Sequence, residues 1–425
     1  MTVILPARGD RPRALSRSVV PYGGMSVDVA RVRGLLPALG DGWARFDAPA
    51  GVSCPEQVAT AVSSALRTPL APPGGFSPAS RRGSATVEAA RRAVADLVGA
   101  DPKGVVLGAS VPALLERFAD AVAHGWERGD EVVLARLGDE DAIAPWRRAA
   151  ARHGARVRTA ELDIETCELP SWQYADLLSE RTRAVAVTAA SPHLGTRTEV
   201  AAIARAAHGV RRRGSGRSGS AHGAETPLVV VDAGAAAAFL PLDLETMDVD
   251  VLTLAAAAWG GPPVGALVVR EPELLDRFPG LEPDDLPLAL LAGVPASVDH
   301  LAGLDDTATG PRRDRVLASL GALQAHHEDL MAHLLDELRW SPGITVIGDP
   351  PRRIPSLALV VSGRTASEVA ARLADHGVCV LTDPGDHGAF AALGLAEVGG
   401  VVRVGLAPST SRAEVDLLVR ALRSC

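Results

Sequence analysis

Lysine is almost absent from this chain. Lys103 is the only lysine among 43 lysine and arginine residues, so nearly all of the basic side chains are arginines. This bias accompanies abundant alanine, glycine and valine, a combination typical of a GC-rich genome. Any chemistry that needs a lysine amine therefore depends on this single position.

Cysteines are few and widely spaced. The four cysteines, Cys54, Cys167, Cys379 and Cys425, form no C-x-x-C pair, so the sequence indicates neither a metal centre nor a disulfide framework. Cys379 lies within an apolar strand pattern, which predicts a buried structural thiol rather than a reactive one.

Long apolar runs are also missing. No run reaches the roughly 18 residues that a membrane span requires, and the N-terminus lacks the apolar core of a secretory signal. The formal net charge of −8 is modest for 425 residues and gives no reason to expect nucleic acid as a partner. The sequence predicts a cytoplasmic protein that binds neither membrane nor nucleic acid.

The clearest local pattern lies between residues 252 and 270, where two short apolar runs flank the turn Trp-Gly-Gly-Pro-Pro-Val-Gly. Short apolar runs bounded by Gly and Pro predict buried strands. Another such run ends in the carboxylate of Asp232. Strand and helix patterns alternate from Val105 to Arg270, which predicts an α/β fold with a mostly parallel sheet and helices on both faces.

The chain divides into a large N-terminal domain over residues 25–285 and a smaller α+β domain over residues 286–425. The small domain begins with a long helical pattern at 312–338, and its strands are predicted near 344, 357–361, 378–381 and 401–406. Within the large domain, a loop is predicted over 69–80. A helix is predicted from Ser84 to Val98, with Ser84 as its N-cap.

Two segments lack the pattern of a folded core. Residues 1–24 are rich in Arg and Pro and are predicted to be disordered. They represent either a basic tail with a partner or an over-long reading frame whose true start is Met25. Residues 211–224 are basic and of low complexity, which predicts a flexible surface insertion. A binding segment is the alternative for this insertion.

The turn Gly108-Ala109-Ser110 connects a strand to a helix. Backbone N–H groups at such a helix start can hold an anion, although the same turn is often purely structural.

Taken in order, these segments resemble the class V aminotransferases and cysteine desulfurases of the pyridoxal-phosphate (PLP) fold type I superfamily. The family pattern is an Asp at a strand end, then Ser-x-x-Lys, then a Gly-Pro-x-x-Gly turn, and the resemblance extends from Asp47 to Ser424. It implies a homodimer with PLP bound by Gly108, Ala109, Ser110 and Asp232. It also implies that Arg403 holds a substrate carboxylate.

The resemblance fails at the reactive positions. PLP enzymes need a lysine amine to hold the cofactor and to move the substrate proton. The family's Lys, ring-stacking His, Gln, cofactor-contacting Asn and phosphate-side Ser are replaced here by Ala258, Asp139, Ala235, Pro192 and Ala255. Covalently attached PLP is therefore not expected, and no catalytic residue can be assigned.

Three of the remaining polar residues each allow two interpretations. Asp232 either contacts a ring nitrogen or caps the loop after its strand. Arg403 either binds a carboxylate or forms an ion pair with an Asp or Glu. His193 either acts as an acid or base near the pocket or is an ordinary loop residue.

Three functions remain open at this point. The first is a catalytically degenerate homologue with a binding, scaffolding or regulatory role that holds a small carboxylate or phosphate ligand. The second is a transferase or lyase-type enzyme on small amino or carboxylic acids, with PLP bound non-covalently or with an altered pocket. The third is a conventional aminotransferase or desulfurase, which requires the missing lysine. The sequence favours the first.

Overall fold

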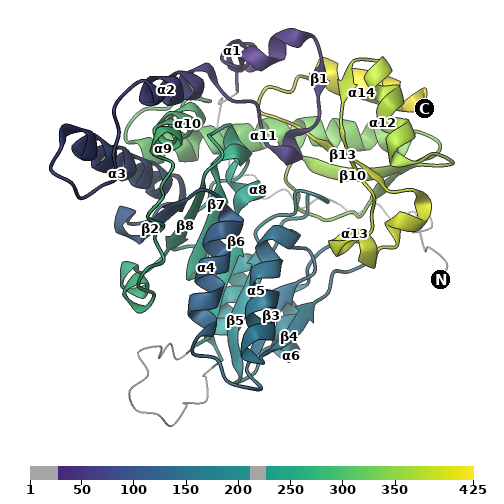
Figure 1. Cartoon of the computed structure of the whole chain (residues 1–425). Helices are drawn as coiled ribbons and strands as arrows, with labels where there is room; N and C mark the ends of the chain where they lie inside the picture. The colour runs from purple at the N-terminus through teal and green to yellow at the C-terminus, as the bar shows by residue number, and fades with distance from the viewer. Residues whose placement is uncertain (1–26, 211–225) are drawn as a thin grey trace.

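The computed structural model describes residues 27–210 and 226–425 (Figure 1). The predictions of a disordered extension over 1–24 and of a flexible insertion over 211–224 fall outside these ranges.

A seven-stranded sheet forms the centre of the large unit, with the strand order β2-β8-β7-β6-β5-β3-β4. All neighbouring strands are parallel except β8, which runs antiparallel to β2 and β7. The predicted mostly parallel sheet is therefore confirmed. The strands are β2 (Val105–Gly108), β3 (Glu131–Ala135), β4 (Arg156–Ala160), β5 (Thr182–Thr188), β6 (Leu228–Asp232), β7 (Val251–Ala255) and β8 (Gly265–Val269).

Successive side chains of the buried strands pack against different helix layers, because side chains alternate between the two faces of a sheet. On β3, Val132 and Leu134 belong to one apolar cluster with helices α4 (Val111–Ala123) and α5 (Glu140–His153). Val133 and Ala135 belong to the other, which includes residues of α3, α7 and α10. Figure 1 shows α4 and α5 on one face of the sheet. The helices of the second layer are α3 (Pro78–Val98), α7 (Val200–His208) and α10 (Gly293–Ala302).

Helix α3 begins earlier than the sequence predicted. Ser77, not Ser84, is the N-cap, and its hydroxyl oxygen accepts a hydrogen bond from the backbone N–H of Ser80. Pro78 occupies the first helical turn, where its missing N–H costs nothing. Ser84 lies inside the helix and donates its hydroxyl to the carbonyl of Ser80.

The C-terminal unit is a four-stranded antiparallel sheet in the order β12-β13-β10-β9, with α11, α12 and α14 packed against it. Its core joins leucines of α11 to valines and leucines of the sheet, as expected for a small α+β unit. The elements are α11 (Arg312–Arg339), β9 (Ile344–Ile347), β10 (Ser356–Val361), α12 (Ala366–Asp375), β12 (Leu381–Asp383), β13 (Val401–Gly405) and α14 (Arg412–Arg423).

The N-terminal part of the chain contributes to this second core. Strand β1 (Ala44–Arg45) pairs in parallel with β11 (Val378–Cys379), and Phe46 is fully buried among the residues of the C-terminal unit. Cys379 lies on a strand as predicted but is only half-buried, with its thiol 3.4 Å from Asp47 Oδ2. The short helices that complete the described chain are α1 (Val29–Gly34), α2 (Glu56–Leu66), α6 (Tyr174–Leu177), α8 (Gly234–Ala237), α9 (Leu288–Leu291) and α13 (Gly388–Ala392).

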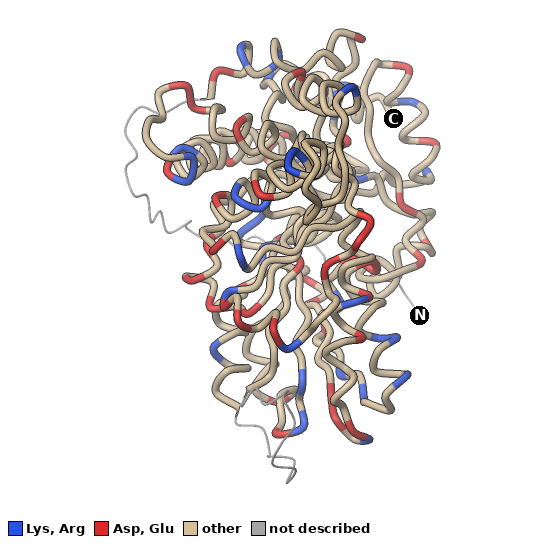
Figure 2. Tube along the Cα trace, turned by 60° about the vertical axis from the view of Figure 1, so that its left-hand side comes forward, with Lys and Arg blue, Asp and Glu red and all other residues tan. Residues whose placement is uncertain are grey.

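Charged side chains of both signs are interspersed over the outer helices and loops (Figure 2). Within residues 27–210 and 226–425, no helix has the length and apolar character needed to cross a membrane. The same residues contain no group of three or more His, Cys, Asp or Glu side chains that could hold a metal ion.

Replacing Phe118 by Ala is expected to destabilise the protein by about 3–5 kcal/mol. Phe118 is fully buried, and its ring meets those of Trp146 and Phe278 edge-on, with centroids 6.0 and 5.3 Å away. The same substitution at Phe76, whose side chain is 95% exposed, is expected to change stability by less than about 0.5 kcal/mol. Denaturant unfolding of both variants measures the contrast, and equal effects would contradict the described core.

Candidate functional site

A cavity of about 350 Å³ lies where the carboxyl ends of β6 and β7 meet the C-terminal unit. Ligand sites in open α/β sheets form at this edge. Separate segments of the described chain contribute to its wall. They are residues 48–51, the start of α4, the N-terminus of α5, Pro192, the segment from Asp232 to Phe239, the 3₁₀ turn Ala256–Trp259 with Ala255 before it, residues 354–356 and Gly405.

The structure brings together the positions that the resemblance singled out. Asp232 and all five replaced positions line this one cavity, although they come from separate segments of the chain. The five are Asp139, Pro192, Ala235, Ala255 and Ala258.

Asp232 is a carboxylate in the wall whose hydrogen-bond partners all lie at one oxygen atom, Oδ1. Its Oδ1 accepts a hydrogen bond from the backbone N–H of Gly234 at 3.1 Å and lies 3.4 Å from the Thr253 hydroxyl. No described residue donates to Oδ2, and no cationic side chain of the described chain forms an ion pair with Asp232. Burial, reinforced by the negative charge of Asp139 and opposed by the Gly234 N–H, raises the pKa of Asp232 to about 6.

Both interpretations of Asp232 keep some support from this geometry. The contact with Gly234 is the local cap that a structural role requires. The partner-free Oδ2 in a cavity wall is what a ligand contact requires.

Asp139 is the N-cap of α5, where its side chain accepts from the Asp141 backbone N–H at 3.1 Å. It also lies 3.5 Å from His193 Nε2. This contact is the main reason that the pKa of Asp139 is below its usual range. Sequence reasoning missed Asp141, which also lines the cavity from the first turn of α5. An acidic residue two positions after a capping Asp is the signal that could have identified it.

The Gly108–Ser110 turn stands beside the cavity rather than in its wall. Ser110 caps α4, and its hydroxyl oxygen accepts from the Ala113 backbone N–H at 3.3 Å, as its position in the sequence predicts. The wall itself contains Val111 and Pro112. Because proline has no N–H, this helix start offers one fewer donor to an anion than an ordinary helix would.

Arg403 lies next to the cavity wall, outside the lining, and has no counter-ion among the described residues. Its neighbours Val402 and Val404 point into the core of the C-terminal unit, so Arg403 lies on the opposite face of β13. It donates to the Pro192 carbonyl at 3.4 Å, and its Nε is buried with no partner. In the described chain no carboxylate lies within ion-pair distance of Arg403, so the structure gives no support to the ion-pair interpretation. Burial lowers the pKa of Arg403.

His193 belongs to the same neighbourhood but not to the cavity wall. Its ring packs edge-on against Phe390, with centroids 5.5 Å apart, and its Nδ1 is buried with no partner among the described residues. Its Nε2 lies within ion-pair distance of Asp139, at 3.5 Å.

No amine of the described residues lines the cavity. Ala258 occupies the 3₁₀ turn where the resemblance places a lysine, and Lys103 is exposed just ahead of β2. Among the described residues, those that line the cavity include three carboxylates but no Lys, Arg or His. Asp232 would suit a protonated pyridine nitrogen, but no described residue in this wall balances a phosphate dianion. The residues present therefore do not fit PLP.

Comparison with known proteins agrees with the architecture. The aminotransferase class-V family profile matches residues 45–283 and 316–418. An uncharacterized protein of Mycobacterium tuberculosis (strain CDC 1551 / Oshkosh) is 46% identical over 412 residues, 94% of this chain and 100% of its own length. A cysteine desulfurase of Escherichia coli O127:H6 is 28% identical over 320 residues, 71% of this chain and 74% of its own.

Solved structures with lower identity show the same fold. The apo cysteine desulfurase from Thermococcus onnurineus NA1 has a TM-score of 0.79 at 21% identity, covering 94% of this chain and 98% of its own. A cysteine desulfurase from Escherichia coli has a TM-score of 0.74 at 22% identity, covering 93% and 97%. The α/β, fold type I architecture predicted from the sequence is thus confirmed.

Replacing Asp232 by Asn is expected to stabilise the protein above pH 6, by up to about 3 kcal/mol. Because the folded pKa of about 6 exceeds the ordinary value, the folded state binds more protons than the unfolded state between about pH 4 and pH 6. The stability of the unmodified protein therefore falls as pH rises through this window, and the Asn variant lacks that loss. Denaturant unfolding at pH 4, 5, 6 and 7.5 measures the difference, which should vanish near pH 4.

Asp375→Asn is the matched control for this pH series, because Asp375 is exposed at the end of α12. It should leave the pH profile unchanged. A parallel shift of the Asp232 variant at every pH would contradict the assigned titration.

Proposed function

The chain belongs to the aminotransferase class-V family, and we propose that it is a member without lysine-dependent PLP chemistry that acts as a small-molecule-binding protein. The proposal includes a scaffolding or regulatory role for the protein in its ligand-bound form. The observation that carries it is the cavity wall at Ala258, in a chain whose single lysine lies elsewhere.

Lys103 cannot replace the missing amine by a small adjustment. It precedes β2, and only the far end of that strand, at Gly108, approaches the cavity. Four strand residues at about 3.3 Å each separate the two ends by roughly 13 Å. Without an amine, neither attachment of the cofactor nor proton transfer by the usual group is available.

The part of the wall formed by the starts of α4 and α5 supports the same proposal. Members of this family typically bind PLP, whose phosphate needs several donors or a counter-charge. Here Pro112 removes a donor from the start of α4, and Asp139 and Asp141 bring negative charge to the wall. These carboxylates repel a dianion, and the surviving residues instead bind and orient a ligand of the opposite charge.

Two residues whose charged groups are still able to bind a ligand favour a second function. Asp232 retains a partner-free Oδ2, and Arg403 has no counter-ion within ion-pair distance in the described ranges. An enzyme acting on small amino or carboxylic acids through an altered pocket would use both. We also infer that the chain forms a homodimer, as family membership suggests.

Purified protein mixed with PLP is expected to form no aldimine in the cavity. After borohydride reduction, mass spectrometry should find pyridoxyl groups only at Lys103 or the α-amino group, because no other amine exists in the chain. The visible absorbance band of a bound internal aldimine should be absent. A cysteine desulfurase that carries the family lysine is the positive control.

Lys103→Arg sharpens this experiment because it removes every lysine from the chain. The absorbance spectrum of this variant with PLP should match that of the unmodified protein. Mass spectrometry should find no pyridoxyl group at position 103. An adduct on a cavity residue would refute the proposed loss of lysine chemistry. A non-covalent band that changes when an amino acid is added would favour the second function.

A further inference from the structure

We propose that the cavity binds a small organic cation, an ammonium group attached to a compact apolar body. This inference rests on the proposed small-molecule-binding function and names the chemical class of its ligand. It replaces the carboxylate or phosphate ligand that the family resemblance suggested.

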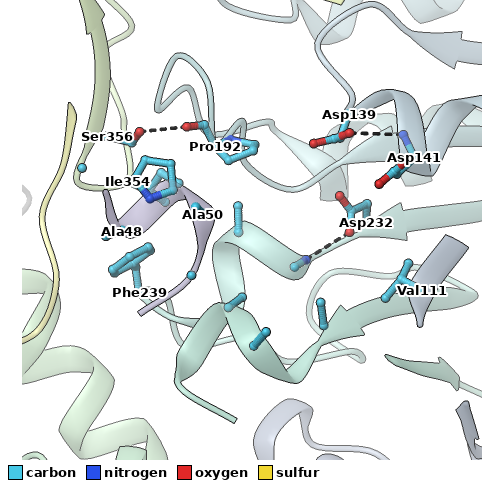
Figure 3. A pocket seen from close by; sticks show the side chains of 18 of the residues that line it. Ala48, Ala50, Val111, Asp139, Asp141, Pro192, Asp232, Phe239, Ile354 and Ser356 are labelled. Atoms are coloured by element: carbon cyan, nitrogen blue, oxygen red, sulfur yellow. Dashed lines mark hydrogen bonds between the residues drawn. The ribbon is translucent and has the colours of Figure 1, made fainter. Parts of the chain in front are cut away.

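The first argument for a cationic ligand is the negative charge of the cavity wall. Asp139, Asp141 and Asp232 line it, and no positively charged residue within 27–210 and 226–425 does. Asp139 lies 3.5 Å from His193 Nε2. Neither Asp141 nor Asp232 forms an ion pair with any described residue. Figure 3 shows the three carboxylates together on one side of the cavity.

The hydrogen bonds of Asp232 give the second argument, because its Oδ2 has no partner among the described residues. Asp232 ends a buried strand, and its partners in the described structure are the N–H of Gly234 and the hydroxyl of Thr253, both at Oδ1. Asp232 is partly buried, and withdrawing a carboxylate from water without a counter-charge costs free energy. A cation at Oδ2 would remove that cost, whereas an anion would increase it.

The opposite side of the cavity suits an apolar group. Ala48, Ala50, Phe239 and Ile354 lie there, away from the carboxylates (Figure 3). A volume of about 350 Å³ is near the lower end of the usual range for small-molecule sites. The site therefore matches a short amine with a small hydrocarbon or aromatic body.

This geometry couples binding to pH. The groups that face Asp232 are Asp139 and Asp141 from α5, the Thr253 hydroxyl from β7 and the Gly234 N–H from α8. Because burial raises the pKa of Asp232 to about 6, the carboxylate is largely protonated at pH 5 and ionised at pH 7.5. A cation should therefore bind more tightly at the higher pH and should release protons when it binds near pH 6.

The test is titration calorimetry of the full chain with three probes of matched shape: benzylamine, benzyl alcohol and benzoate. At pH 7.5, benzylamine should bind at least about tenfold more tightly than benzyl alcohol, while benzoate and inorganic phosphate should show no saturable binding. The affinity for benzylamine should fall about tenfold between pH 7.5 and pH 5, whereas that for benzyl alcohol should not change.

Asp232→Asn should weaken benzylamine binding at pH 7.5 by about tenfold or more, and Asp375→Asn, remote at the end of α12, should leave it unchanged. Preference for benzoate or phosphate, no saturable binding of benzylamine, or full affinity in the Asp232 variant would each overturn the inference. The proposed function is tested by a different measurement. If it is wrong, borohydride reduction with PLP should leave a pyridoxyl adduct in the cavity.

Discussion

Asp232 ends the central strand of a mostly parallel sheet with a carboxylate that no cation of the described chain neutralises. The register of β6 with its neighbours sets this position, because Asp232 is paired with Thr188 of β5 and Thr253 of β7. Those strands keep water away from one side, and the N-terminus of α5 adds two further carboxylates. Burial, together with the negative charges of Asp139 and Asp141, raises the pKa of Asp232 to about 6.

The cavity exists because the C-terminal unit is fastened over the strand ends. The Ser356 hydroxyl donates to the Pro192 carbonyl at 2.9 Å, and the Ile354 N–H donates to the Gly195 carbonyl at 2.8 Å. Gly195 has a φ of +78°, and a Cβ there would lie 1.9 Å from the Ser356 carbonyl oxygen. The close approach of the two units therefore requires glycine at this position.

The fold of this protein and the side chains that line its cavity give different information about its function. Its architecture is that of the aminotransferase class-V family, and its cavity occupies the edge of the sheet where α/β proteins bind ligands. The side chains lining the cavity are nevertheless mostly alanine, proline and aspartate. A shared scaffold therefore gives little information about the reaction, and the residues in the wall decide which ligand fits.

The sequence alone determined the strands, the end of β6 at Asp232, the Ser110 cap and the lack of a second lysine, because these depend on composition or on neighbours a few residues apart. It did not reveal that Ser77 begins α3, since competing serines offer similar caps. Only the tertiary structure joined β1 to β11, brought Asp141 beside Asp232, and left Arg403 without a carboxylate partner in the described part of the chain. Those relations link residues tens to hundreds of positions apart, and long-range packing, rather than local pattern, decides which of them meet.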